Sequence, residues 1–190
     1  MNKIFAGLLC AFFTLQGSLA FGSEQEALTK EARTVMKGFG MQLKSTLVSA
    51  MKKGGPVNAL GVCNTKAGPI TTKNAQESGW NIGRTSLKLR NPSNKADAWE
   101  LAVLNDFEAK KAAGANPKKL EYSAIVEKDG KKTFRYMKAI PTGKPCLFCH
   151  GTEIKAPVKE KIAAHYPNDK ATGFQLGDIR GAFSLSKELK

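Results

Sequence analysis

Residue types that mark many functional classes are scarce in this chain. Its 190 residues include two histidines, four cysteines and two tryptophans, and only 16 acidic residues stand against 30 basic ones. With so few cysteines and histidines, a close grouping of them is hard to ascribe to chance. No acid/base pair and no nucleophile with a partner base stands out, so we do not expect an enzyme.

Long hydrophobic runs are also missing, except at the N-terminus. Residues 4–15 follow Lys3, are too few to span a bilayer comfortably, and precede the small-residue stretch 18–20. This arrangement predicts a secretory signal peptide over residues 1–20, removed on export. No later stretch is apolar enough to cross a membrane. We therefore expect a mature chain, residues 21–190, that has no transmembrane segment and is periplasmic in a bacterium.

The formal charge of +14 is spread over scattered lysine pairs rather than gathered in one block. A secreted basic protein has little access to nucleic acid, so an acidic protein partner or an anionic surface suits this charge better. Internal repeats, low-complexity segments and long linkers are absent as well. These absences predict a single domain over residues 21–190.

The pattern of apolar residues predicts helices first and antiparallel strands afterwards, which is typical of an α+β domain. Breaks are expected at Gly54-Gly55-Pro56 and at Gly68-Pro69. The expected elements are a long helix over 24–52, a short helix around Cys63, an extended segment over 80–94, a helix over 95–113 with Asn94 as N-cap, a hairpin turning at Asp129-Gly130, a short helix over 157–165 and a last strand over 179–186.

Two cysteines and a histidine are concentrated in the stretch "GKPCLFCHG". Pro145 and Gly151 favour the start and the end of about one helical turn. On such a turn Cys146 and Cys149 share a face, and His150 lies four residues past the first cysteine. Two thiols in this arrangement can bond to the two vinyl groups of one haem, with the imidazole beneath the iron, as C-x-x-C-H motifs do. The motif predicts one covalently attached haem c.

Covalent haem is joined to the apoprotein outside the cytoplasmic membrane, so the motif and the signal peptide agree without depending on each other. We also expect the second ring nitrogen of His150 to donate to a carbonyl or a carboxylate, as metal-bound histidines usually do.

Two other uses of the cysteines stay open. A periplasmic dithiol/disulfide oxidoreductase also uses C-x-x-C, although the thioredoxin-like βαβ pattern is missing. A structural zinc site could combine Cys63 and His165 with the motif cysteines, although no second C-x-x-C accompanies the first. Haem remains the favoured interpretation.

Without the signal peptide the chain keeps three cysteines, so one thiol is left over in an oxidising compartment. If Cys146 and Cys149 carry the haem, Cys63 has no disulfide partner. Coordination of iron would explain how this thiol survives, and a small buried hydrophobe is the usual alternative. The other candidates for the sixth ligand are His165, Met36, Met41, Met51 and Met137.

Four stretches carry a family resemblance: "GVCNTKAGPI", "WNIGRTSLKLRNPSNKADAWE", "PCLFCHG" and "YPNDKATGFQLGDIRGAFSLS". In this order they resemble a bacterial family of single-haem c-type proteins with a PAS-like fold, which occurs as free secreted proteins and as the haem sensor of kinases and chemoreceptors. The resemblance covers nearly the whole mature chain. It implies about five antiparallel strands with flanking helices, and an axial pair formed by His150 and Cys63.

The segment "RTSLKLRNPSN" also contains two arginines, Arg84 and Arg90, and either could pair with a haem propionate. They could equally hold the local turn together. His165 is interpreted as a surface or turn residue. Asp169 and Asp178 are interpreted as turn residues rather than cation ligands.

Two functional classes follow. Thiolate ligation and a PAS-like architecture favour a module that senses redox state or a diatomic gas such as CO or NO. A soluble one-electron carrier that meets an acidic partner is the second expectation. In either case an anionic thiolate ligand predicts a low reduction potential.

Overall fold

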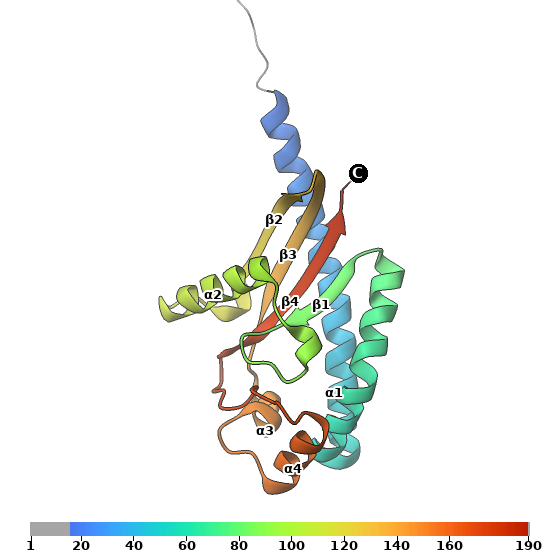
Figure 1. Cartoon of the computed structure of the whole chain (residues 1–190), viewed down its shortest axis with the longest axis vertical. Helices are drawn as coiled ribbons and strands as arrows, with labels where there is room; N and C mark the ends of the chain where they lie inside the picture. The colour runs from blue at the N-terminus through green and yellow to red at the C-terminus, as the bar shows by residue number, and fades with distance from the viewer. Residues whose placement is uncertain (1–15, 190) are drawn as a thin grey trace, which may run out of the picture.

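The computed structural model describes residues 16–189 (Figure 1). The greater part of the predicted signal peptide, residues 1–15, lies outside the described residues. Within the described part, no helix is both long enough and apolar enough to cross a membrane. In chain order the elements are α1 (Gln16–Ser78), β1 (Asn81–Thr85), η1 (Pro92–Asn94), α2 (Ala98–Ala112), η2 (Pro117–Lys119), β2 (Glu121–Lys128), β3 (Lys131–Pro141), η3 (Lys144–Cys146), α3 (Leu147–His150), α4 (Ala156–His165) and β4 (Ile179–Glu188).

The longest element, α1, consists of two helices joined at a break. Gly54 and Gly55 have non-helical backbone angles, and Gly55 takes φ 65° and ψ −163°, a combination that glycine adopts far more readily than other residues. The chain reverses there, so the two halves of α1 lie side by side (Figure 1), and Asn74 on the second half donates to Gln42 on the first at 2.6 Å. The predicted break at this point is confirmed.

The second predicted break, at Gly68-Pro69, is wrong. Both residues lie inside α1, which continues to Ser78. The second half of α1 packs against the first half, where Asn74 donates to Gln42, and against α4, where Leu60 meets Val158 and Ile162. This packing outweighs the local preference of glycine and proline to end a helix. Cys63 therefore lies inside the long second half of α1 rather than in the separate short helix that the sequence predicted.

Within residues 16–189 the strands form one antiparallel sheet of four, in the order β1-β4-β3-β2, where the resemblance implied about five. The hairpin of β2 and β3 turns at Asp129 and Gly130, both with positive φ, as predicted. The first half of α1 covers one face, where Trp80, Tyr136 and Leu185 are buried. The α+β class expected from the sequence is confirmed.

The other face of the sheet is covered by α2, which buries Val103, Leu104 and Phe107. This helix begins later than predicted. Asp97 is the N-cap, because its carboxylate accepts from the Glu100 backbone while the Glu100 carboxylate accepts from the Asp97 backbone. The earlier candidate, Asn94, instead ends the 3-10 turn η1. No such reciprocal pair was available at the predicted start.

The elements η3, α3 and α4 gather at one end of the molecule, beside the turn of α1 (Figure 1). Leu60 of α1 is buried there against Ile154, Val158 and Ile162. Since Leu60 lies one helical turn before Cys63, this cluster brings Cys63 to the same end as the attachment motif. The candidate site therefore lies at this end of the molecule, where α1 meets α3.

Candidate functional site

The attachment motif forms the short turn that its sequence predicts. Pro145 lies in the first turn of η3, α3 follows as a single turn, and the Gly151 backbone N–H donates to the Leu147 carbonyl at 3.0 Å. A Cβ on Gly151 would lie 2.6 Å from that carbonyl oxygen, so a side chain there would disturb the end of the turn. The turn carries Cys146, Cys149 and His150 together.

Cys63, Cys146 and Cys149 are unpaired thiols, and each is half-buried. Burial raises the pKa of the Cys149 thiol, and the positive charge of Arg90 offsets this only in part. In a C-x-x-C oxidoreductase the first cysteine, here Cys146, is the attacking thiolate and the second stays protonated. The raised pKa of Cys149 therefore does not separate the oxidoreductase alternative from haem attachment.

The orientation of His150 is fixed by one strong hydrogen bond. Its Nδ1 lies 2.6 Å from the Ala171 carbonyl oxygen. A carbonyl only accepts, so Nδ1 carries the proton and Nε2 keeps the lone pair that a metal can take. The expected donation from the second ring nitrogen to a carbonyl is thus confirmed.

The His150 imidazole is also held in its neutral form. Burial, followed by the nearby positive charges of Arg180 and Arg90, lowers the pKa of His150 to about 3. A neutral imidazole is the metal-binding form of histidine. His150 can therefore bind a metal at neutral pH without first losing a proton.

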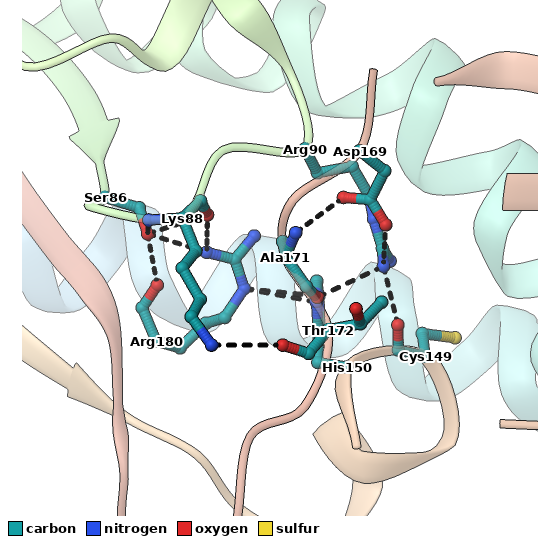
Figure 2. Close-up of polar contacts among 9 residues, drawn as sticks. All are labelled: Ser86, Lys88, Arg90, Cys149, His150, Asp169, Ala171, Thr172 and Arg180. Atoms are coloured by element: carbon teal, nitrogen blue, oxygen red, sulfur yellow. Dashed lines mark hydrogen bonds and ion pairs between the residues drawn. The ribbon is translucent and has the colours of Figure 1, made fainter. Parts of the chain in front are cut away.

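Arg180, at the start of β4, lies against the His150 ring (Figure 2). Its Nε is 3.2 Å from Nδ1 and 3.5 Å from Nε2. Because Nδ1 donates to Ala171, only Nε2 can accept from Arg180, and a metal on Nε2 would have to displace this contact. The sequence interpretation did not identify Arg180, although it is the one charged residue in the run "IRGAFSLS".

Arg90 forms a cluster of contacts with the protein backbone and with Asp169 (Figure 2). Its Nη2 donates to the Cys149 carbonyl at 2.6 Å, to Asp169 Oδ2 at 2.9 Å and to the Ala171 carbonyl at 3.3 Å. These contacts tie Arg90 to the attachment turn and to the loop of Asp169 and Ala171, rather than to the local turn around residues 91–94. The Nε of Arg90 is buried and has no hydrogen-bond partner in the described part of the chain.

Asp169 and Asp178 both act within turns, as predicted. Asp169 Oδ1 accepts from the Ala171 backbone at 2.9 Å, and Asp178 Oδ2 accepts from the Gln175 backbone at 2.7 Å. Each carboxylate also meets a cation, Arg90 in the first case and Lys111 in the second. The sequence did not show that Asp169 reaches the attachment motif.

Cys63 faces a positively charged environment. Burial raises the pKa of its thiol, and Arg84 and then Arg90 oppose that rise. The Arg84 guanidinium has no hydrogen bond or ion pair to any of residues 16–189, and burial lowers the pKa of Arg84. Cys149 also lies close enough for its charge to interact with that of Cys63.

The positive charge of Arg180 interacts with those of Arg90 and Arg84, and the only acid that forms an ion pair with any of the three within residues 16–189 is Asp169. Partly buried positive charge is unfavourable unless an anion balances it. A haem brings two carboxylates, and guanidiniums bind carboxylates well. The charge of the site and the unpaired Nε of Arg90 therefore fit a haem.

His165 contacts Asn64, the residue after Cys63. Asn64 Nδ2 lies 3.3 Å from Nδ1 of His165, whose Nε2 is buried without a hydrogen-bond partner among residues 16–189. It ends α4, which agrees with its interpretation as a turn residue, but it is half-buried rather than on the surface. Within residues 16–189, no three side chains of His, Cys, Asp or Glu are grouped to hold a metal ion. The zinc alternative, which needed such a group, is therefore not supported.

Comparisons with known proteins place the chain in a family. Among solved structures, it is similar to the cyanobacterial heme-protein Tll0287, with 25% sequence identity and a TM-score of 0.61, over 87% of this chain and 96% of that one. No curated protein matches it. A family model described as Tll0287-like matches residues 19–187. Since this match spans nearly the whole chain and confirms the resemblance seen in its motifs, the protein belongs to the Tll0287-like family.

Proposed function

We propose that the protein binds one haem c, bonded through Cys146 and Cys149, and acts as a periplasmic redox and gas-responsive module. The family match and the likeness to a protein described as a heme-protein support haem binding. The single observation that carries the proposal is the attachment turn, which presents two thiols and a neutral imidazole whose Nε2 carries no proton.

His150 and Cys63 serve as the two axial ligands in this proposal. His150 offers Nε2 without deprotonation, whereas Cys63 must first lose the proton that burial favours. Arg84 assists this loss, because its positive charge stabilises the thiolate. Bound haem would supply a one-electron centre whose potential depends on these two ligands.

Arg84 and the Nε of Arg90 are the groups that receive the propionates. Arg84 has no other partner in the described part of the chain, and Arg90 has one unused buried donor. Arg180 contacts Nε2 of His150, so iron bound there would displace its guanidinium, which would then supply a third donor to a propionate. The positive excess at the site is then balanced by two carboxylates.

Cys63 is also the residue that makes the centre responsive. Burial raises the pKa of Cys63 and favours the protonated thiol, so Cys63 would be held less firmly than His150 by a reduced iron. A centre whose Cys63 is protonated would be able to take up CO or NO. Electron transfer to an acidic partner is the second candidate, and the charge of +14 favours it.

Replacing Cys63 with alanine tests the ligand assignment. We expect Cys63→Ala to keep the covalent haem but to lose the thiolate signature of the ferric absorption and electron paramagnetic resonance spectra, and to raise the reduction potential. Met41→Ala is the control, because Met41 was a candidate ligand and its side chain is exposed. Spectra of Cys63→Ala identical to those of the unmodified protein would remove Cys63 from the iron.

A further inference from the structure

The Arg90 guanidinium contacts both segments that are joined by the hydrogen bond orienting His150. The Nη2 of Arg90 donates to the carbonyl of Cys149, the residue before His150, at 2.6 Å. It also donates to the Ala171 carbonyl at 3.3 Å, and this same oxygen accepts from His150 Nδ1. A carbonyl oxygen has two lone pairs, so it can accept from both donors at once.

Asp169 completes the connection on the loop side. Its Oδ2 accepts from Arg90 at 2.9 Å, and its Oδ1 accepts from the Ala171 backbone at 2.9 Å. The two charged side chains are only 9% and 7% exposed, so water competes little for these contacts. Two backbone bonds, from Phe174 to the His150 carbonyl and from Gly173 to the Gly151 carbonyl, join the same loop to α3.

We propose that Arg90 and Asp169 are positioning residues that set the hydrogen bond from His150 Nδ1 to Ala171, and through it the donor strength of Nε2 toward iron. A firm bond from Nδ1 increases electron density on the ring, which strengthens the imidazole as a ligand and favours ferric iron. The inference rests on the proposed haem function, but the hydrogen-bonded clamp that it describes is a property of the protein alone.

An ion pair with a purely structural role would not need these additional hydrogen bonds to the backbone around His150. Buried ion pairs are often replaceable by apolar residues without loss of stability. Here the pair contacts the carbonyl of Cys149, which precedes His150, and the carbonyl and amide of Ala171, which accepts from His150. A substitution that keeps the charge but changes the geometry should therefore alter the hydrogen bond of His150. The planar guanidinium reaches several acceptors at once, whereas a lysine amine is a compact point charge.

Three variants of the mature holoprotein test the proposal. Arg90→Lys keeps the charge and loses the shared geometry, and Asp169→Asn keeps the shape and loses the charge. The matched control is Asp178→Asn, which removes a carboxylate that also binds a turn amide and a cation but has no contact with His150. Each variant is measured by hydrogen exchange at the Ala171 amide and by redox titration.

We expect Arg90→Lys and Asp169→Asn to speed exchange at the Ala171 amide by about tenfold. We also expect the ferrous-to-ferric ratio at a fixed potential to rise by about tenfold, which is a positive shift of about 59 mV for one electron. Asp178→Asn should leave both quantities within about twofold of the unmodified protein.

The proposal is overturned if Arg90→Lys changes only one of the two quantities or neither, or if Asp178→Asn changes them equally. Should Arg90→Lys fail to accumulate, the double variant Arg90→Gln/Asp169→Asn, which leaves no unpaired charge, is measured with the same criteria. If the unmodified protein carries no haem, the proposed function fails, while the exchange measurement still tests the clamp around Ala171.

Discussion

The two proposed axial ligands differ in what each must do before it can bind iron. The His150 imidazole is neutral, because burial and two neighbouring arginines keep its pKa far below physiological pH. The Cys63 thiol is protonated, because burial raises its pKa more than Arg84 and Arg90 lower it. In our account the histidine therefore stays bound, and the cysteine is the ligand that can dissociate and bind again.

A pH-dependent contribution to stability is expected from Glu121. Hydrogen bonds from Arg33, assisted by Tyr136, lower the pKa of Glu121 from 4.5 to about 2. Its stabilising effect is complete above about pH 4.5 and is lost as the pH falls toward 2. We expect Glu121→Gln to lower the free energy of unfolding by about 1–2 kcal/mol at neutral pH, a value discounted for the half-exposed Arg33.

Urea unfolding of Glu121→Gln and of the unmodified protein at several pH values checks this expectation. The two curves should converge near pH 2. Glu188→Gln is the control, since the Glu188–Lys131 pair is largely exposed and should contribute little. A constant difference between the Glu121→Gln variant and the unmodified protein at every pH would contradict the assignment.

Contacts between residues close together in the sequence could be predicted, whereas contacts between distant residues could not. Pro145 and Gly151 fix one turn, so the relative placement of Cys146, Cys149 and His150 followed from local geometry. Ala171 and Asp169 act through a loop with no periodic pattern, about 20 residues further along. No short-range signal joins such a loop to the imidazole, so the clamp became visible only in three dimensions.

At the scale of elements, the reversal of α1 places Cys63 beside the attachment turn, and it depends on one backbone conformation. Gly55 has φ 65° and ψ −163°, where a residue with a Cβ is strained. We expect Gly55→Ala to lower the free energy of unfolding by about 1–3 kcal/mol. Thermal unfolding followed by circular dichroism would measure the loss.

A second glycine of the same helix provides the control. Gly38 lies in the helical first half of α1, with no neighbour that an added Cβ would meet. Gly38→Ala should therefore stabilise the protein by about 0.5–1 kcal/mol, because alanine favours the helix. Equal effects of the two substitutions would show that the break does not depend on Gly55.

Elements with strong local signals were predictable, and those decided by packing were not. The hairpin at Asp129-Gly130 and the break at Gly54-Gly55 follow from the backbone preferences of a few residues. The passage of α1 through Gly68-Pro69 depends on contacts with distant segments, which outweigh local preference. The start of α2 was missed because a reciprocal cap at Asp97 and Glu100 is stronger than the single candidate upstream.

At the scale of the whole molecule, the charge of +14 bears on which of the two functional classes applies. If the protein is an electron carrier, its basic surface should speed encounter with an acidic redox partner, and salt should slow that encounter. We expect stopped-flow transfer to such a partner to slow by about tenfold between low and physiological ionic strength if it is a carrier. Tight CO binding with negligible transfer at any salt concentration would instead assign it to sensing.

The central claim is that one haem is bonded to Cys146 and Cys149, and mass spectrometry of the mature protein after export and denaturation tests it most directly. We predict a chain beginning at residue 21 that is heavier by one haem, with a Soret band that survives denaturation and is lost in the double variant Cys146→Ala/Cys149→Ala. A protein of unmodified mass, colourless or with haem that dissociates on unfolding, would contradict the account.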